Sequence, residues 1–199
     1  MLKRTPFYFL RHGQTEWNRL NLMQGQTDTP LNPIGLDQAE SAARFLSKRK
    51  ITSIITSPLR RARQTADLIS SRINAPVLVL KDLGECAFGV YEGHPPGPWR
   101  DEWFAGAEVP GAESFKSFVA RSLAGLNAAL AYGGRPLIVA HGGTFWAIRR
   151  HALAGKMVRA ENCAVMALAP PKSETARKWG LKLLFSQEKS ESPGTNIAA

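Results

Sequence analysis

The chain has 199 residues, of which 44% are hydrophobic and 21% charged, and its formal net charge is +10 at pH 7. This length and composition are typical of one globular domain with a sizeable core. With two cysteines, the chain has neither a disulfide framework nor a thiolate metal cluster.

Four short apolar runs have strand character, and polar residues that can bind phosphate follow each of them. The runs are residues 7–10, 51–56, 77–80 and 137–140, and the polar segments that follow begin at Arg11, Ser57, Leu83 and His141. In open α/β sheets, ligands bind at the carboxyl ends of the strands. We therefore expect these segments to meet in one site. Later strands are expected over 164–169 and over 180–185, the second as an antiparallel edge.

Apolar residues at helical spacing predict four helices between these strands. The first begins at the cap Asn32, with Pro33 in its first turn, and runs to about Lys48. The second has Ser57 as its N-cap and Pro58 as its first residue, and the others cover 115–129 and 145–153. This alternation predicts an α/β fold, a single-domain three-layer sandwich in which helices cover both faces of a mostly parallel sheet. Residues 1–186 would form that domain, and 187–199 a flexible tail.

Residues 94–109 fit neither a strand nor a helix. The segment is too irregular for a strand, and its start is too rich in proline for a helix. It contains Pro95, Pro96, Pro98, Trp99, Trp103 and Phe104. Two interpretations stay open. The segment is either a surface loop held down by its aromatic side chains, or a lid whose aromatics contact the organic part of a substrate.

The positive charge favours acidic partners, and phosphate esters and nucleic acids both qualify. No basic tract is long enough to resemble a nucleic-acid arm; the densest run, Lys48-Arg49-Lys50, suits the end of a helix. No apolar run has the length of a membrane-spanning helix, and the stretch before Arg11 is too short for a signal peptide. We therefore expect a cytoplasmic protein that binds neither nucleic acid nor membrane.

The tripeptide Arg11-His12-Gly13 combines two groups that suit phosphate chemistry. Arginine offers a rigid, charged fork to phosphate oxygens, and neutral histidine is a nucleophile. Alone, the tripeptide also fits an ordinary loop.

Further segments recur with it in a specific order. They are residues 11–18, Gly25 with 30–32 and Gly35, 38–39, 57–59 with 61–62 and 64–66, Glu85 with Gly89 and 92–93, 110–114 and 141–143. In this order and spacing the chain resembles the histidine phosphatase superfamily, in the branch of the cofactor-dependent phosphoglycerate mutases. The resemblance runs from about residue 7 to about residue 168 and implies the phosphoglycerate mutase-like fold.

The resemblance also implies roles for individual residues. His12 would be the nucleophile that carries a phosphohistidine, and Glu85 the general acid, which must be protonated to donate. Arg11, Arg61 and His141 would surround the phosphate. Secondary phosphate donors would be Asn18, Thr15 and the backbone N–H of Gly142.

Some residues of these motifs fit a role in the site, and others fit a structural role. The family arginine directly precedes the alanine of its motif, which selects Arg61 and leaves Arg60 on the surface. A backbone carbonyl near Gly13 is expected to fix the tautomer of His12. Glu16 is a candidate partner of a site arginine, whereas Glu92 fits a structural turn.

The other two histidines are expected outside the chemistry. His151 fits a solvated helix position, and His94 borders the segment 94–109, where contact with substrate stays open. No histidine pair has metal-ligand spacing, so we expect neither a metal nor another cofactor.

The chain also departs from the family pattern. Ala140 stands where a hydroxyl residue is frequent, Tyr91 where Trp is common, Ala112 where Gly is frequent and Gln14 where Glu is frequent. None of these changes removes a catalytic group, but they bear on substrate preference.

These residues predict a phosphomonoesterase that acts on a small-molecule phosphate ester. Glu85 and His141 are 56 residues apart, which suits the shorter phosphatases of the family rather than its mutases. A mutase is the first alternative. A non-catalytic phospholigand or nucleic-acid binder is the second, although a binder needs neither a nucleophile nor an acid. The natural substrate, and whether the protein is a monomer or a homodimer, stay open.

Overall fold

Six strands form one mixed sheet in the order β3-β2-β4-β1-β5-β6. They are β1 (Phe7–Arg11), β2 (Ile54–Thr56), β3 (Val77–Val79), β4 (Leu137–Ala140), β5 (Val165–Ala169) and β6 (Gly180–Phe185). Strands β1 to β4 are parallel, β5 is antiparallel to β1, and β6 is antiparallel to β5. This computed structural model describes residues 1–153, 158–173, 176 and 178–187.

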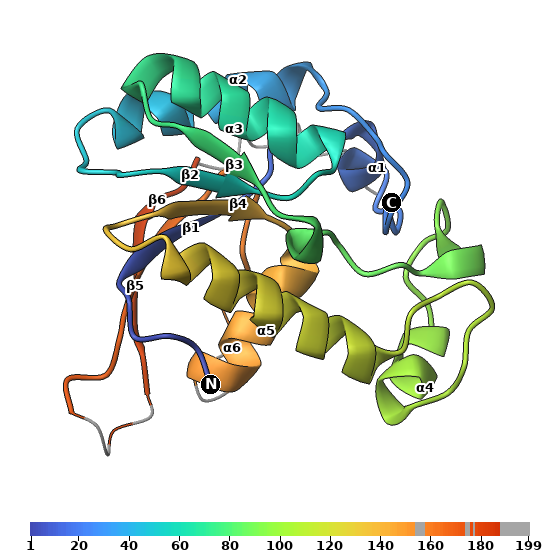
Figure 1. Cartoon of the computed structure of the whole chain (residues 1–199). Coiled ribbons are helices and arrows are strands. Elements are labelled where there is room, and N and C mark those ends of the chain that lie inside the picture. Colours follow the sequence, from blue (N-terminus) through green and yellow to red (C-terminus); the bar gives the residue numbers. More distant parts are fainter. Residues whose placement is uncertain (154–157, 174–175, 177, 188–199) are drawn as a thin grey trace, which may run out of the picture.

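Helices cover both faces of this sheet (Figure 1), so the expected three-layer α/β arrangement is confirmed. Helices α2 (Pro33–Leu46) and α3 (Arg60–Ile73) lie on one face, and α5 (Phe115–Ala131) and α6 (Gly142–Ala152) on the other. The remaining elements are the short helices α1 (Glu16–Arg19) and α4 (Trp99–Ala105) and the 3-10 turns η1 (Lys81–Leu83) and η2 (Gly89–Tyr91).

The side chains of β1 show how the sheet separates two hydrophobic cores. Phe7 and Phe9 pack into the cluster that includes α5 and α6, whereas Tyr8 and Leu10 pack into the cluster that includes α2 and α3. Successive strand residues point to opposite faces, so a strand covered on both sides must be apolar throughout. Burial of each such side chain contributes about 1.5–3 kcal/mol.

The start of α2 is as the sequence predicts. The Asn32 side chain accepts a hydrogen bond from the Gly35 N–H at 2.8 Å, and Pro33 is the first helical residue. The helix ends at Leu46, two residues before the expected Lys48.

The start of α3 is a correction. Ser57 and Pro58 do not begin the helix; Leu59 is its N-cap, makes no side-chain capping bond, and Arg60 is the first helical residue. The Ser57 hydroxyl instead accepts the Leu59 N–H at 3.2 Å and contacts the imidazole of His141 at 2.7 Å. A capping residue was therefore expected where the structure has a hydrogen-bond partner for a site histidine.

Other boundaries differ by a few residues. Strand β2 begins at Ile54 rather than at residue 51, and α6 begins at Gly142 rather than at residue 145, because the first turn of α6 is made by two glycines without an apolar signal. Strand β6 is the antiparallel edge that was expected. Of the tail, residues 188–199 lie outside the described residues. Within the described ranges, no helix is long and apolar enough to cross a membrane.

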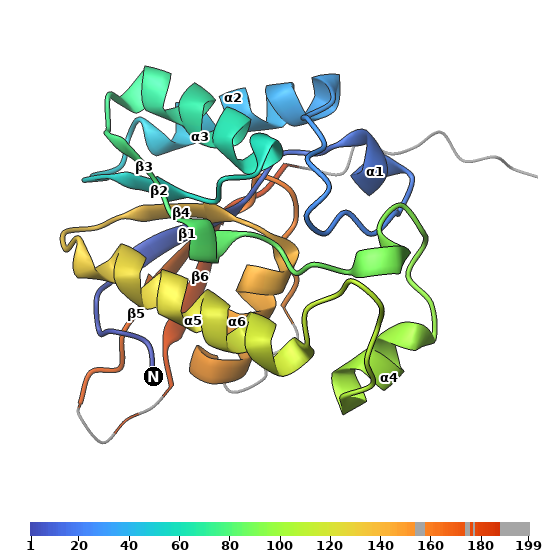
Figure 2. The ribbon, with the colours of Figure 1, turned by 45° about the vertical axis from the view of Figure 1, so that its right-hand side comes forward.

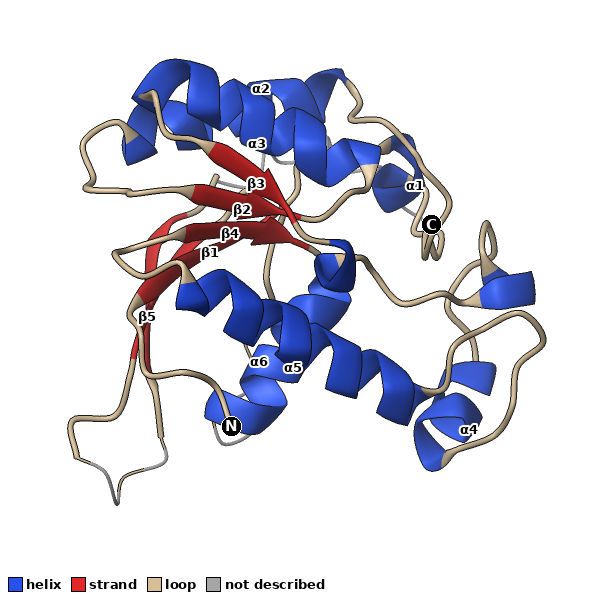
Figure 3. Ribbon diagram, in the orientation of Figure 1, coloured by secondary structure: helices blue, strands red, loops and turns tan. Residues whose placement is uncertain are grey.

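The carboxyl ends of β1 and β4 are neighbours in the sheet, with Arg11 opposite Ala140. After β1 the chain continues to α1 and then to α2 on one face, whereas after β4 it continues to α6 on the other. The strand arrows of β2 and β4 point towards the side where α1 and α4 lie (Figure 3), and the turned view shows α1 and α4 on that same side (Figure 2). Such a divergence is the switch point at which open α/β sheets bind ligands.

Candidate active site

A cavity of about 460 Å³ opens at this switch point. Six of the eight site residues predicted from the sequence line it, and Thr15 and His141 do not. The six are Arg11, His12, Asn18, Arg61, Glu85 and Gly142.

His12 directly continues β1, because its N–H donates to the carbonyl of Ala140 at 3.0 Å. Its Nδ1 lies 2.7 Å from the Gly13 carbonyl oxygen, which can only accept, so Nδ1 carries the proton and Nε2 keeps its lone pair. The expectation that a carbonyl near Gly13 fixes the tautomer is confirmed. Burial, followed by the charges of Arg61 and Arg11, holds the His12 pKa well below its ordinary value. The imidazole is therefore neutral at neutral pH.

Arg61 is fully buried in the first turn of α3, whereas the adjacent Arg60 is exposed, as expected. Its Nη2 donates to the Gly25 carbonyl at 2.8 Å and its Nη1 to the Thr27 carbonyl at 2.9 Å. Burial lowers the Arg61 pKa to about 10, so the guanidinium stays charged at neutral pH. The loop that contains Gly25 thus fixes the direction of this cation.

Three buried nitrogen atoms in the site have no hydrogen-bond partner among the described residues. They are Nε of Arg11, Nε of Arg61 and Nδ1 of His141. A buried donor without an acceptor is costly. Other nitrogen atoms of the same side chains are paired: both Nη atoms of Arg61 donate to carbonyls, and Nε2 of His141 contacts Ser57. Three unpaired nitrogens in one site suit an anion with several acceptor oxygens.

His141 follows β4 and is fully buried, with its ring centroid 5.2 Å from that of His12. The Ser57 oxygen, which accepts the Leu59 N–H, lies 2.7 Å from Nε2 of His141. If Ser57 donates its own proton to Nε2, neutral His141 carries its proton on Nδ1, the unpaired atom. Burial and the charge of Arg61 lower the His141 pKa well below its ordinary value.

Glu85 reaches the cavity from the loop that follows η1. Its carboxylate accepts the Cys86 N–H at 2.9 Å and the Gly143 N–H at 3.1 Å, so the first turn of α6 holds it. A Cβ at position 143 would lie 2.2 Å from Oε1 of Glu85 and 2.6 Å from Cζ of Phe118. Position 143 therefore has to be glycine for the carboxylate to keep this place.

Thr15 does not line the cavity and has a structural role instead. Its hydroxyl caps α1 by accepting the Asn18 N–H at 3.1 Å, and it also contacts Oε1 of Gln24 at 3.0 Å. Glu16 does not pair with a site arginine; it forms an exposed ion pair with Arg19. Glu92 has a structural role, as expected, because its carboxylate accepts the N–H groups of Gln26 and Thr27, both at 2.9 Å.

Asn162 is a site residue that the sequence did not reveal. Its side-chain amide donates to the His12 carbonyl at 2.7 Å and contacts the Asn18 side chain at 3.3 Å. It lies 150 residues from His12 along the chain. The one available signal was its place two residues before the expected strand at 164–169.

Aromatic residues make up much of the remaining wall. The cavity is lined by Trp17, Phe88, Trp103, Phe104, Phe115, Phe118 and Trp146. Within the segment 94–109, Trp103 and Phe104 line the cavity, whereas Trp99 stacks on Tyr91 with ring centroids 4.1 Å apart. The expectation that this segment forms neither a strand nor a helix is wrong for Trp99–Ala105, which form α4. Trp99 holds the segment to Tyr91, and Trp103 and Phe104 face the cavity.

The two remaining histidines do not line the cavity, and both are exposed: His94 lies before α4 and His151 near the end of α6. Across the described residues, no group of three histidine, cysteine or acidic side chains could hold a metal ion.

Comparison with known proteins identifies relatives of the whole fold. A family model described as histidine phosphatase superfamily (branch 1) matches residues 7–177. A curated protein of Yersinia pestis (strain Pestoides F), named "Probable phosphoglycerate mutase GpmB", is 33% identical over 177 residues, covering 79% of this chain and 81% of that protein.

Solved structures are similar as well. The mycobacterial glucosyl-3-phosphoglycerate phosphatase in complex with VO3 has a TM-score of 0.76 and 30% identity, covering 92% of this chain and 100% of the other. The alpha-ribazole phosphatase of Shigella flexneri has a TM-score of 0.76 over 92% of this chain and 96% of the other, and at 24% identity it shares the fold.

Proposed function

Because this chain belongs to the histidine phosphatase superfamily (branch 1), we propose that it hydrolyses small phosphate monoesters through a phosphohistidine on His12. One observation carries this proposal: the Gly13 carbonyl holds the proton of His12 on Nδ1, at 2.7 Å, inside a cavity that also contains Arg11, Arg61 and Glu85. The lone pair of Nε2 is therefore available as a nucleophile.

The substrate phosphate would bind between the two guanidinium groups. Arg11, Arg61 and His141 supply the unpaired nitrogens, and Asn18 and the N–H of Gly142 are further donors. Fixed charges in a buried site need little reorganisation when charge shifts during phosphoryl transfer. Burial, together with the charges of Arg61 and Arg11, lowers the His12 pKa and keeps the imidazole neutral.

Two steps would complete the reaction. Nε2 of His12 attacks phosphorus, the bond from phosphorus to the ester oxygen breaks, and the leaving oxygen takes the proton of Glu85. Water then attacks the phosphohistidine and gives a proton to the Glu85 carboxylate, and the electron pair of the nitrogen–phosphorus bond returns to Nε2. The products are an alcohol and inorganic phosphate, and the enzyme is restored.

The segment 94–109 would act as a lid whose aromatics contact the organic part of the substrate. Trp103 and Phe104 line the cavity beyond the charged groups. An apolar wall binds an organic group without competing for the phosphate.

A phosphoryl transfer of the mutase type is the second candidate, and the name of the Yersinia pestis relative favours it. In a mutase a substrate hydroxyl, rather than water, receives the phosphoryl group. Incubation of 3-phosphoglycerate with a bisphosphoglycerate primer separates the two, because isomerisation marks a mutase and free phosphate marks a phosphatase.

The test of the main proposal is phosphate release from p-nitrophenyl phosphate and from a panel of phosphometabolites that includes phosphoglycerate esters. We expect release by the wild type and at least a roughly thousandfold loss in His12→Ala, as for other nucleophiles that act as part of a unit. The matched control is His151→Ala, which removes an exposed histidine. Release that survives in His12→Ala would contradict the proposal.

A further inference from the structure

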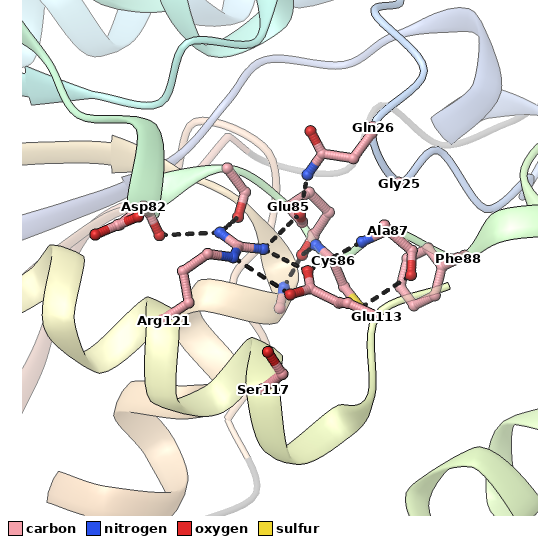
Figure 4. A network of polar contacts seen from close by, with 12 residues as sticks. Gly25, Gln26, Asp82, Glu85, Cys86, Ala87, Phe88, Glu113, Ser117 and Arg121 are labelled. Atoms are coloured by element: carbon pink, nitrogen blue, oxygen red, sulfur yellow. Dashed lines mark hydrogen bonds and ion pairs between the residues drawn. The ribbon is translucent and has the colours of Figure 1, made fainter. Parts of the chain in front are cut away.

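We propose that Arg121 is the positioning residue for Glu85: by holding the backbone of the loop around Glu85, it places the carboxyl where the leaving oxygen departs. This inference rests on the proposed function, since it concerns the general acid of that reaction. Arg121 lies on α5, and Figure 4 shows its side chain directed at the loop.

The contacts of Arg121 are distributed along the loop. Nη1 donates to the carbonyls of Asp82 and Gly84, at 3.1 and 3.0 Å, and Nη2 donates to the carbonyl of Glu85 at 3.1 Å. One rigid guanidinium thus fixes three carbonyls within four successive residues. Lysine cannot do the same, because its ammonium is a single point at the end of a flexible chain.

Glu113 completes this arrangement from the loop before α5. Its carboxylate pairs with Nη2 of Arg121 and accepts from Nε at 3.3 Å, and its Oε1 also accepts the Ala87 N–H at 3.2 Å. The side chains of Arg121 and Glu113 are only 25% and 19% exposed. The pair therefore holds the loop on both sides of Glu85 and Cys86.

The opposite side of the loop is also fastened. The Gln26 side chain donates to the Glu85 carbonyl (Figure 4), and the Phe88 N–H donates to the Glu92 carboxylate at 3.1 Å. Helix α5 approaches the loop closely, since a Cβ at Gly125 would lie 2.9 Å from the carbonyl carbon of Asp82. Gly125 is one turn from Arg121, so both act from the same face of α5.

The hydrogen bonds of Arg121 act on Glu85 through the backbone of the loop, and its guanidinium also lies 5.5 Å from the centroid of the Phe118 ring, which lines the cavity. No atom of Arg121 lines the cavity, whereas Glu85 and Cys86 do. Loss of Arg121 should leave phosphate binding intact and displace the acid. General acid catalysis depends on a carboxyl within hydrogen-bond reach of the leaving oxygen, and it matters most when that oxygen is strongly basic.

The experiment compares an alkyl phosphate with p-nitrophenyl phosphate in wild type, Arg121→Met, Arg121→Lys and Glu85→Gln. In both Arg121 variants we expect kcat/KM for the alkyl ester to fall about 10- to 100-fold, part of the roughly 10²–10⁴-fold that general acid catalysis supplies. For p-nitrophenyl phosphate, kcat/KM should change less than about threefold, because its leaving group needs little protonation.

A second readout separates positioning from general damage. The displaced carboxyl would also activate water less well, so kcat and KM for p-nitrophenyl phosphate should fall together, with a burst of nitrophenol before steady state. Lys116→Met, an exposed change on the same helix, should keep wild-type values for both esters.

Equal losses of kcat/KM for the two esters, or no loss for either, would overturn the inference. If Arg121→Met does not fold, Arg121→Lys gives the same comparison, because it keeps the charge and loses the three-carbonyl contact. A wild type that releases phosphate from neither ester would instead overturn the proposed function, and the inference with it.

Discussion

Gly143 occupies the point where the first turn of α6 meets Glu85, the proposed general acid. Its N–H donates to the Glu85 carboxylate, and a Cβ there would lie 2.2 Å from that carboxylate and 2.6 Å from Phe118. We expect Gly143→Ala to displace the acid and lower kcat/KM for alkyl phosphates by about 10-fold or more. Folding should suffer little from the backbone change, because alanine favours helix over glycine by about 1 kcal/mol.

The control for this change is a glycine with room for a methyl group. At Gly180, the nearest atom to an added Cβ is the Cβ of Ala169, at 3.7 Å. Gly180→Ala should therefore keep the wild-type rate on both alkyl and aryl esters. A Gly143→Ala variant as fast as Gly180→Ala on the alkyl ester would show that the Glu85 carboxylate does not need this close approach.

Single residues also show what the sequence could predict of the site. Arg11 and His141 could be found because the ends of neighbouring parallel strands meet at one edge of the sheet. Asn162 and Arg121 could not be found in this way. Asn162 donates to the carbonyl of His12 and Arg121 to the carbonyl of Glu85, and in both cases the partner is far away in the chain. Such contacts follow from tertiary packing and leave no periodic signal.

At the scale of elements, the sequence predicted helices best where local chemistry defines the first turn. The Asn32 and Pro33 pair marks the start of α2, and the structure has it there. Ser57 and Pro58 carry the same signal, yet α3 starts at Arg60, and the Ser57 hydroxyl accepts the Leu59 N–H and contacts His141. Because a serine side chain can also bond the neighbouring backbone outside a helix, a capping motif does not by itself fix the first helical residue.

Helix α4 is the element on which substrate preference should depend. Its Phe104 lines the cavity, packs edge-on against Phe115 with centroids 4.9 Å apart, and is 37% exposed, whereas Trp103 is 4% exposed. We expect Phe104→Ala to raise KM about 3- to 10-fold for naphthyl phosphate, since the lost contact is worth about 0.5–1.5 kcal/mol. Small esters such as glycerol phosphate should be unaffected.

Because Trp103 is buried and donates from Nε1 to the Glu113 carbonyl at 3.0 Å, replacing it would confound binding with folding. Phe104 is therefore the better probe of this helix. The measurement is steady-state KM of Phe104→Ala for naphthyl phosphate and glycerol phosphate, and the unfolding temperature of the variant checks that it is folded. An equal rise in KM for both esters would mean that α4 does not discriminate between organic groups.

At the scale of the whole molecule, the site places two neutral histidines, the buried Arg61 and the half-buried Arg11 at the edge of the sheet, in a protein whose net charge is already +10. The pKa values of His12 and His141 lie well below their ordinary value in the folded protein. In the unfolded chain both would return to about 6.5. The free energy of unfolding should therefore depend on pH through the site itself.

Below about pH 6.5 the unfolded chain binds protons at these two histidines while the folded protein does not, so stability falls as the pH is lowered. Each histidine contributes a slope of about 1.4 kcal/mol per pH unit until the pH reaches its folded pKa. We expect urea unfolding of His12→Gln between pH 7 and pH 5 to show a slope lower than that of the wild type by about one such contribution. If His12→Gln keeps the wild-type slope, His12 takes up its proton in the folded protein as readily as in the unfolded chain, and burial and the two arginines do not hold it neutral.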